Sequence, residues 1–188
     1  SFTKNQMNNF DFICDYFMKN YNSKIGRHLF NSKATINYKN KYELVRLGIG
    51  LFGVTNSKGL HQISTMTSVV SQIKIINQGE FVGYGMNYCS KERVKIGIIP
   101  FGYADGIYEK KNSDNYYVFI KNSKYKVIGD ISMDSLVVNL ENSKIEEGDK
   151  VILFDSNYTI KEIAKSCNTS EYEMLSKLNR RIKREYYS

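Results

Sequence analysis

The feature that most constrains the fold of this chain is a series of short apolar segments between residues 65 and 154. These segments are rich in β-branched residues, and Gly, Asn and Asp separate them at intervals of about ten to fifteen residues. Such spacing is typical of antiparallel strands joined by turns. We therefore predict a mainly antiparallel β domain. Its candidate strands lie at 67–77, 80–84, 94–100, 116–121, 126–130, 136–140 and 150–154.

The first 55 residues follow another pattern, in which helical and strand-like segments alternate. Apolar residues between positions 10 and 18 recur at the spacing of one helical face. Short apolar runs at 28–30 and 44–45 are strand candidates, and one helical turn is expected near 35–38. This alternation predicts an α/β arrangement with parallel strands.

A change in composition after the first 55 residues divides the chain into two predicted domains. An α/β fragment occupies residues 1–58, and the β-rich domain occupies residues 59–188. Two short helices, near 160–166 and 171–178, are expected at the end of the β-rich domain.

Composition excludes several classes of function. The formal net charge is +8, but the lysines are mostly scattered singly, with no run of five like charges before the mixed tail 177–184, so we expect no nucleic acid and no membrane partner. No apolar run approaches the ~20 residues of a membrane-spanning helix, and no signal peptide is expected at the N-terminus. Three distant cysteines, Cys14, Cys89 and Cys167, match neither a disulfide framework nor a metal-binding spacing. They predict a cytoplasmic protein without a metal site.

Two segments of the α/β part have the residue types of an anion site. Arg46 follows a predicted strand, and Gly48 and Ile49 begin the next predicted helix, where backbone N–H groups and the helix dipole favour a phosphate. Asn31 and Ser32 follow the neighbouring strand and could add an amide and a hydroxyl to the same anion. The alternative is an ordinary strand-to-helix turn that binds nothing.

Three glycine-led loops of the β part carry the other candidates. Tyr84 lies between two glycines, and Tyr103 stands in the stretch GYADG. Glycine permits a close backbone approach or a bulge that changes the direction of a side chain. Met133 and Asp134 end the third loop, GDISMD. The alternatives are tyrosines at hairpin edges and a methionine that fills the core.

In their order and approximate spacing, these motifs resemble those of the alanine racemase family. The matching stretches are HLFNS, VRLGIGLFGV, VGYG, IIPFGYADG, ISMD and RIKREYY. The resemblance covers essentially the whole chain but only the C-terminal half of the family's length. The VGYG and RIKREYY forms are most similar to members fused behind a cell-wall amino-acid ligase. The resemblance implies the C-terminal end of a TIM-type β/α barrel over 1–58, followed by the family's β-rich C-terminal domain over 59–188.

The resemblance also implies an activity, the pyridoxal 5'-phosphate-dependent interconversion of L-alanine and D-alanine, which serves peptidoglycan synthesis. The enzyme it implies works as a head-to-tail homodimer. By position, Tyr84 matches the catalytic tyrosine, which reaches the cofactor of the partner subunit. Tyr103 matches the tyrosine at the substrate entrance. Met133, with the adjacent Asp134, matches the substrate-binding pair in which the methionine backbone helps to hold the carboxylate.

The cofactor-binding residues implied by the resemblance lie in the α/β part. Arg46 matches the arginine that faces the pyridine nitrogen. Ser32, Gly48 and Ile49 match the residues around the phosphate, and Asn31 matches an adjacent asparagine. Because an arginine keeps its own proton, it leaves the ring nitrogen unprotonated, which favours racemisation over transamination.

Part of the family's machinery is not matched by this chain. The lysine that bonds the cofactor, the histidine that tunes the tyrosine and the arginine that binds the substrate carboxylate are absent. Lys4, Lys19 and Lys24 lie in the wrong context to replace that lysine. We therefore expect this chain by itself to be inactive. Two other interpretations stay open, a racemase of another small amino acid such as serine and a non-catalytic dimerisation module.

Overall fold

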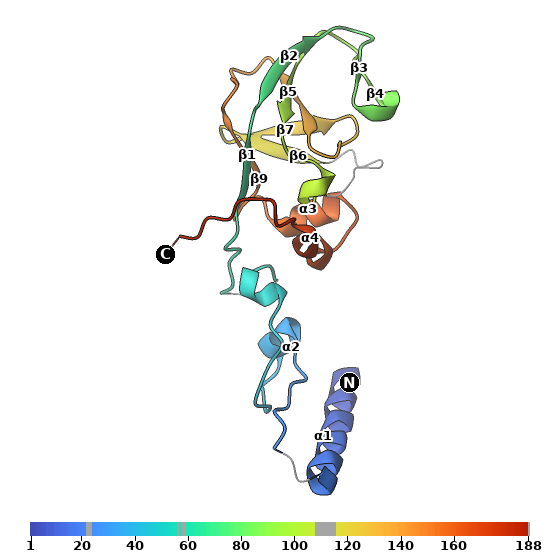
Figure 1. Ribbon diagram of the computed structural model, residues 1–188, viewed down its shortest axis with the longest axis vertical. Helices are drawn as coiled ribbons and strands as arrows, with labels where there is room; N and C mark the ends of the chain where they lie inside the picture. The colour runs from blue at the N-terminus through green and yellow to red at the C-terminus, as the bar shows by residue number, and fades with distance from the viewer. Residues whose placement is uncertain (22–23, 56, 58, 108–115, 188) are drawn as a thin grey trace. The chain divides into compact units, whose positions relative to one another are not determined.

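The computed structural model describes residues 1–21, 24–55, 57, 59–107 and 116–187. The chain forms two compact units, Ser1–His61 (unit 1) and Gln62–Ser188 (unit 2). Lys58, at the predicted domain boundary, lies outside the described residues. The two units are described separately below (Figure 1).

Unit 2 is built on a seven-stranded sheet with the order β1-β9-β6-β7-β8-β5-β2. Every neighbouring pair in this sheet is antiparallel, which confirms the predicted antiparallel β domain. A separate small hairpin joins two further strands. The strands of the large sheet are β1 (Met66–Val69), β2 (Gln72–Ile76), β5 (Val94–Ile99), β6 (Tyr117–Ile120), β7 (Ser123–Ile128), β8 (Leu136–Glu141) and β9 (Lys150–Phe154), and those of the hairpin are β3 (Phe81–Val82) and β4 (Tyr88–Cys89).

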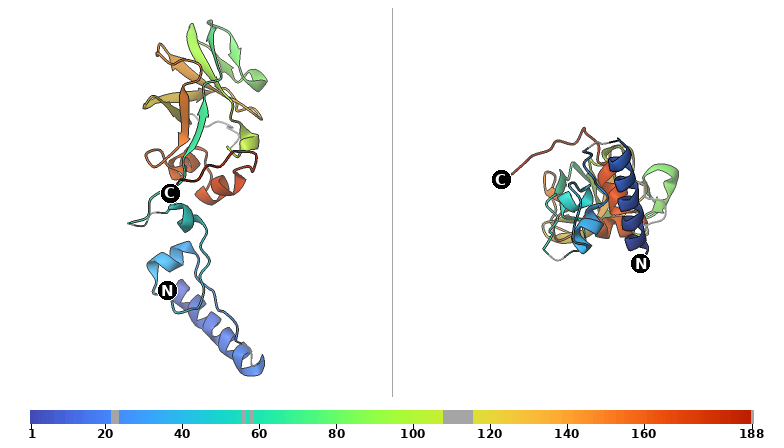
Figure 2. Two further views of the ribbon diagram at one scale, coloured as in Figure 1. Left: turned by 60° about the vertical axis from the view of Figure 1, so that its left-hand side comes forward. Right: turned by 90° about the horizontal axis from the view of Figure 1, so that it is seen from below.

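The two edges of the large sheet are formed by consecutive parts of one segment. The strand predicted over 67–77 is interrupted at Val70 and Ser71, so the structure has β1 and β2 in its place. The N–H of Val70 donates to the carbonyl of Asp149 (2.9 Å), and the N–H of Ser71 donates to the carbonyl of Ile98 (2.9 Å). Because the segment changes partners at this point, the sheet must curl, as Figures 1 and 2 show.

Alternating burial along the strands builds the core of unit 2. In β8, Leu136, Val138 and Leu140 are fully buried, while the residues between them are partly exposed. The predicted short helices are confirmed as α3 (Ile160–Ser166) and α4 (Glu171–Lys177). A capping box begins α3, where the N–H of Thr159 donates to the Glu162 carboxylate (2.7 Å).

Unit 1 contains α1 (Phe2–Tyr21), α2 (Ser32–Asn37) and the short 3-10 helix η1 (Ile49–Phe52). The helices predicted from the apolar spacing at 10–18 and from the turn near 35–38 are thus confirmed as α1 and α2. The strands predicted at 28–30 and 44–45 are wrong as regular strands, because the described residues form only one β-bridge beside them, the parallel pair of Asn31 and Arg46. Parallel pairing is slightly weaker per residue than antiparallel pairing, and each segment pairs with one neighbour only.

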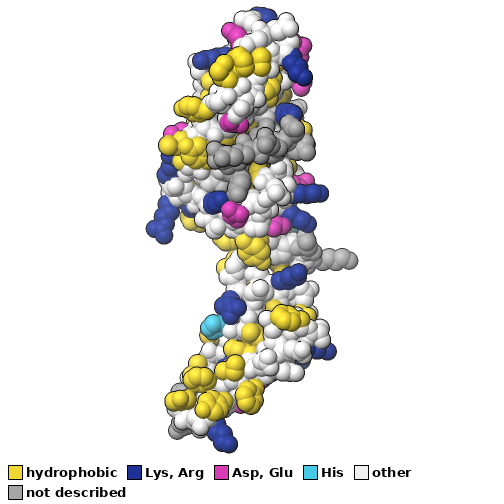
Figure 3. All heavy atoms as spheres, turned by 90° about the vertical axis from the view of Figure 1, so that its right-hand side faces the viewer, with side chains coloured by type: hydrophobic (Ala, Val, Ile, Leu, Met, Phe, Trp, Pro, Cys, Tyr) yellow, Lys and Arg dark blue, Asp and Glu magenta, His cyan; other side chains and the backbone are white. Residues whose placement is uncertain are grey.

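Helix α1 has an apolar face but buries none of its residues. Its exposed apolar side chains are Phe2, Phe12, Ile13, Tyr16, Phe17, Met18 and Tyr21. Figure 3 shows hydrophobic side chains gathered at the lower end of that view, which is unit 1. No helix in the described part of the chain has the length and apolar character needed to cross a membrane.

We expect the amides of α1 to exchange with deuterium much faster than those of β5 and β8. A helix with no fully buried residue, whose packing contacts are partly exposed like that of Phe10 with the Tyr42 ring, has little tertiary packing to keep its hydrogen bonds closed. Hydrogen-exchange mass spectrometry of the 188-residue chain measures both regions in one sample. Equal protection of α1 and β8 would contradict this prediction.

Candidate functional site

The candidate phosphate site of unit 1 is built around the hydroxyl of Ser32. Its Oγ accepts the backbone N–H groups of Gly48 (3.0 Å) and Gly50 (3.1 Å). Ser32 is buried, and the hydroxyl proton stays available for an acceptor because both of these contacts use Oγ as the acceptor. A Cβ added at Gly48 would meet nothing within 4 Å, so the space beside this backbone is open.

Asn31 and Arg46 meet through the parallel bridge. The Asn31 Oδ1 accepts the N–H of Ala34 (2.9 Å) and thereby caps α2, which leaves the amide nitrogen as the donor that can face a ligand. The Arg46 N–H donates to the carbonyl of Phe30 (2.7 Å). Together with the bond from the Leu44 N–H to the Arg27 carbonyl (3.1 Å), it holds the two segments side by side.

His28 orients the guanidinium of Arg46. The Arg46 Nη1 donates to the His28 carbonyl (3.1 Å) and lies 3.3 Å from the His28 Nδ1. The other guanidinium nitrogens remain able to donate. Sequence reasoning gave His28 no role, although it belongs to the matched stretch HLFNS, because only the folded backbone brings residues 28 and 46 together.

Tyr84 lies on a turn that two glycines with positive φ make possible. Gly83 has φ 79° and Gly85 has φ 70°, a region that residues with a Cβ rarely adopt. A Cβ on Gly83 would lie 3.1 Å from the backbone nitrogen of Asp130, and the Asn87 amide donates to the Asp130 carboxylate. The turn is thus fixed against the segment 129–134, while Tyr84 itself is 76% exposed.

The Tyr103 loop lies directly on the same segment. The N–H of Tyr103 donates to the carbonyl of Ser132 (3.0 Å), and the N–H of Ala104 donates to the carbonyl of Met133 (3.1 Å). Gly102 makes this approach possible, because a Cβ there would lie 2.3 Å from the Met133 oxygen. Tyr103 and Met133 therefore come from loops that touch backbone to backbone.

Arg181 connects this pair of loops through two carboxylates. Its Nε donates to the Asp105 Oδ1 (2.6 Å), and its Nη2 donates to the Asp134 Oδ1 (2.7 Å). Asp105 is buried and also accepts the N–H of Gly102 (2.9 Å). Burial raises the pKa of Asp105, but the Arg181 and Gly102 donors outweigh it, so the net pKa is lowered. The sequence offered a signal for Arg181, its place in RIKREYY, but no role.

The predicted site residues thus form two groups, each gathered within one unit. Unit 1 holds Asn31, Ser32, Arg46, Gly48 and Ile49, and unit 2 holds Tyr84, Tyr103, Met133 and Asp134. In unit 2, the segment 129–134 contacts both tyrosine loops, a relation that spacing along the chain could not reveal.

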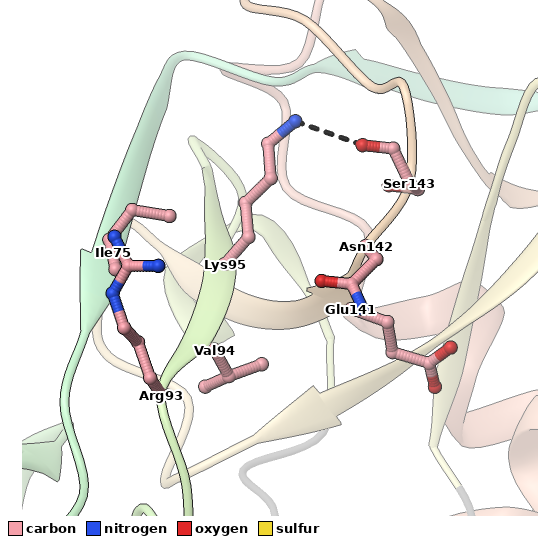
Figure 4. Close-up of a pocket in the computed structure, with 7 residues that line it drawn as sticks. All are labelled: Ile75, Arg93, Val94, Lys95, Glu141, Asn142 and Ser143. Atoms are coloured by element: carbon pink, nitrogen blue, oxygen red, sulfur yellow. Dashed lines mark hydrogen bonds between the residues drawn. The ribbon is translucent and has the colours of Figure 1, made fainter.

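A polar cavity elsewhere in unit 2 contains none of these residues. It encloses about 200 Å³ between the ends of β2, β5 and β8. Figure 4 shows the Lys95 amine directed at the loop after β8, where it donates to the carbonyls of Ser143 (3.1 Å) and Ile145 (2.6 Å). Lys95 therefore holds that loop in place.

Two protein-family models match this chain. The model for "Alanine racemase, N-terminal domain" matches residues 1–56, and that for "Alanine racemase, C-terminal domain" matches residues 63–186. The chain belongs to the alanine racemase family. This agrees with the predicted fold, the end of a TIM-type barrel followed by a mainly antiparallel β domain.

Individual members of the alanine racemase family match almost the whole chain. The alanine racemase of Helicobacter pylori strain Shi470 is 32% identical and that of Borreliella burgdorferi strain ZS7 is 33% identical, over 97% and 98% of this chain. These alignments cover 53% and 52% of the relatives, so the chain spans about half their length.

Solved alanine racemases have the same fold. The enzyme from Streptomyces lavendulae aligns with a TM-score of 0.87 at 27% identity, over 97% of this chain and 51% of that one. The Clostridium difficile 630 enzyme, in complex with cycloserine, aligns with a TM-score of 0.82 at 32% identity, over 96% and 50%.

We expect Gly102→Ala to destabilise unit 2 by about 3 kcal/mol, because the added methyl overlaps the Met133 carbonyl and forces the two loops apart. Gly148→Ala is the matched control. A Cβ there meets nothing within 4 Å, so only its positive φ costs stability, about 1 kcal/mol. Urea unfolding of the three proteins measures both effects, and equal losses would contradict the steric argument.

Acid should weaken the contact between Arg181 and Asp105. Since the folded-state pKa of Asp105 is below the usual 3.8, its contribution to stability is present above that pH and is lost as the pH falls through the folded pKa. Arg181→Met removes the main group that lowers this pKa, so acid unfolding should begin at a higher pH. An unchanged acid-unfolding curve for the variant would contradict this.

Proposed function

We propose that the protein that carries this chain is an alanine racemase, which interconverts L-alanine and D-alanine with pyridoxal 5'-phosphate as cofactor. The match of both domain models over nearly the whole chain supports this proposal most strongly. We further propose that it acts as a homodimer in the cytoplasm and supplies D-alanine for peptidoglycan.

The residues of unit 1 fit this cofactor. A phosphate needs convergent donors. The Ser32 hydroxyl, which accepts the N–H groups of Gly48 and Gly50, and the backbone N–H of Ile49, the first residue of η1, would supply them. Asn31 adds its amide nitrogen beside them.

Arg46 fits the pyridine nitrogen. A guanidinium has N–H donors and no acceptor, so Arg46 would donate a hydrogen bond to the ring nitrogen without transferring a proton to it. The Nη1 of Arg46 is held by His28, so its Nη2 and Nε are the nitrogens that could donate to the ring. When bound, pyridoxal 5'-phosphate supplies the electron sink that makes the Cα proton of an amino acid acidic.

Tyr84 is proposed to move that proton on one face of Cα. Racemisation needs a base on each face, and a phenolic oxygen can remove a proton and return one. The turn of Gly83 and Gly85 leaves Tyr84 outward, with most of the residue exposed. An outward tyrosine is suited to act on a cofactor held by a second copy of the chain.

Tyr84→Phe in the complete gene product tests this role. Cofactor absorbance should remain, because Ser32 and Arg46 are unchanged, while racemisation should fall by roughly 10²–10⁴-fold. In deuterium oxide the base on the other face should still exchange the Cα proton of one enantiomer. Deuterium entering one alanine enantiomer but not the other is the expected signature.

The matched control is Tyr172→Phe, which removes the hydroxyl of another exposed tyrosine on α4. It should racemise alanine normally. Near-normal turnover by the Tyr84→Phe variant would overturn the role of Tyr84. A complete wild-type protein with no pyridoxal absorbance and no racemisation of alanine would overturn the proposed function itself, and a preference for serine over alanine would reassign its substrate.

A further inference from the structure

The turn at residues 132–134 presents two backbone donors on one side. The carbonyls of Ser132 and Met133 both point at the Tyr103 loop, where they accept the N–H groups of Tyr103 and Ala104. All described peptide bonds are trans, and in a trans peptide the N–H points opposite to the carbonyl. The N–H groups of Met133 and Asp134 therefore both point away from the Tyr103 loop.

Two adjacent backbone N–H groups that point the same way suit a carboxylate, which has two oxygens to accept them. Neither of these N–H groups donates to another described residue. The same turn, however, carries the carboxylate of Asp134, whose side chain is 64% exposed. An uncompensated negative charge at this position would repel an incoming carboxylate.

Arg181 supplies the compensating charge. One arm of its guanidinium donates to Asp134 and another donates to Asp105. Asp105 is held in a fixed position, because it is buried and has two backbone donors. Its carboxylate accepts the N–H of Gly102, and its backbone carbonyl accepts the N–H of Asn179. The planar fork of arginine can bridge two carboxylates at fixed positions, which a lysine ammonium cannot do equally well.

We propose that Arg181 is a positioning residue for the carboxylate of the substrate. It cancels the charge of Asp134 and ties the 132–134 turn to the Tyr103 loop, so that the N–H groups of Met133 and Asp134 are held as a pair of donors for that carboxylate. This inference rests on the proposed function for the identity of the substrate, but its geometry lies within unit 2 alone.

The kinetic test is a double-mutant cycle in the complete gene product. Arg181→Met should raise the KM for alanine about three- to fivefold, the upper range for a partly exposed ion pair, and change kcat by less than about twofold. In the Asp134→Asn background the same change should raise KM by less than about twofold, because no charge is left to cancel.

Two further variants complete the cycle. Lys183→Met removes one positive charge from the same tail, where Lys183 pairs with Glu185, and should leave KM unchanged. Arg181→Lys keeps the charge but loses the bridge, so its KM should lie between those of wild type and Arg181→Met. An equal rise in KM in both Asp134 backgrounds, or no rise in either, overturns the proposal.

A binding measurement separates this inference from the proposed function. In the ¹⁵N-labelled 188-residue chain, acetate should shift the amide signals of Met133 and Asp134 in the wild type, weakly in Arg181→Met and normally in Lys183→Met. Absence of these shifts in the wild type, or an undiminished response in Arg181→Met, overturns the positioning role. Failure of the complete protein to racemise alanine overturns the proposed function and leaves the acetate result standing.

Discussion

The backbone contact between Gly102 and the 132–134 turn is the constraint on which the candidate site of unit 2 depends. A single added methyl would lie 2.3 Å from the Met133 oxygen, so this approach exists only because residue 102 has no side chain. Once the loops touch, the carbonyls of Ser132 and Met133 become acceptors for the Tyr103 loop. The directions of the Met133 and Asp134 N–H groups then follow from the geometry of the peptide bond.

The Tyr84 turn also packs against the segment 129–134, and a glycine again makes the close backbone approach possible. Gly129 has φ 66°, and a Cβ on it would lie 2.8 Å from the carbonyl of Val82. Glycine therefore lets β3 approach residues 129 and 130 at one end of the segment, while Gly102 approaches its other end. The loops of Tyr84 and Tyr103 are thus both positioned by one short stretch of backbone. Neither tyrosine is buried, so their placement comes from the backbone and not from side-chain packing.

In unit 1, two residues of the candidate phosphate site are buried, whereas the longest helix is largely exposed. The residues of that site are well held, since Ser32 and Ile49 are buried and the Asn31 to Arg46 bridge joins the two segments. Helix α1 has no fully buried residue and exposes most of its apolar face, although Phe10 packs edge-on against the ring of Tyr42. A geometry for binding phosphate is therefore present in a unit whose longest helix is only partly packed. The contrast accords with a chain that spans about half the length of its relatives.

The sequence by itself determined the antiparallel β domain, the two closing helices and the family, because strand spacing and glycine-led motifs are local properties. It also pointed to Tyr84, Tyr103 and Met133 through those motifs, and their roles remain proposals. It did not determine that one predicted strand over 67–77 divides at Val70 to pair with both sheet edges. Nor did it determine the roles of His28 and Arg181. Those depend on contacts across 18, 76 and 47 positions, which only the folded backbone creates.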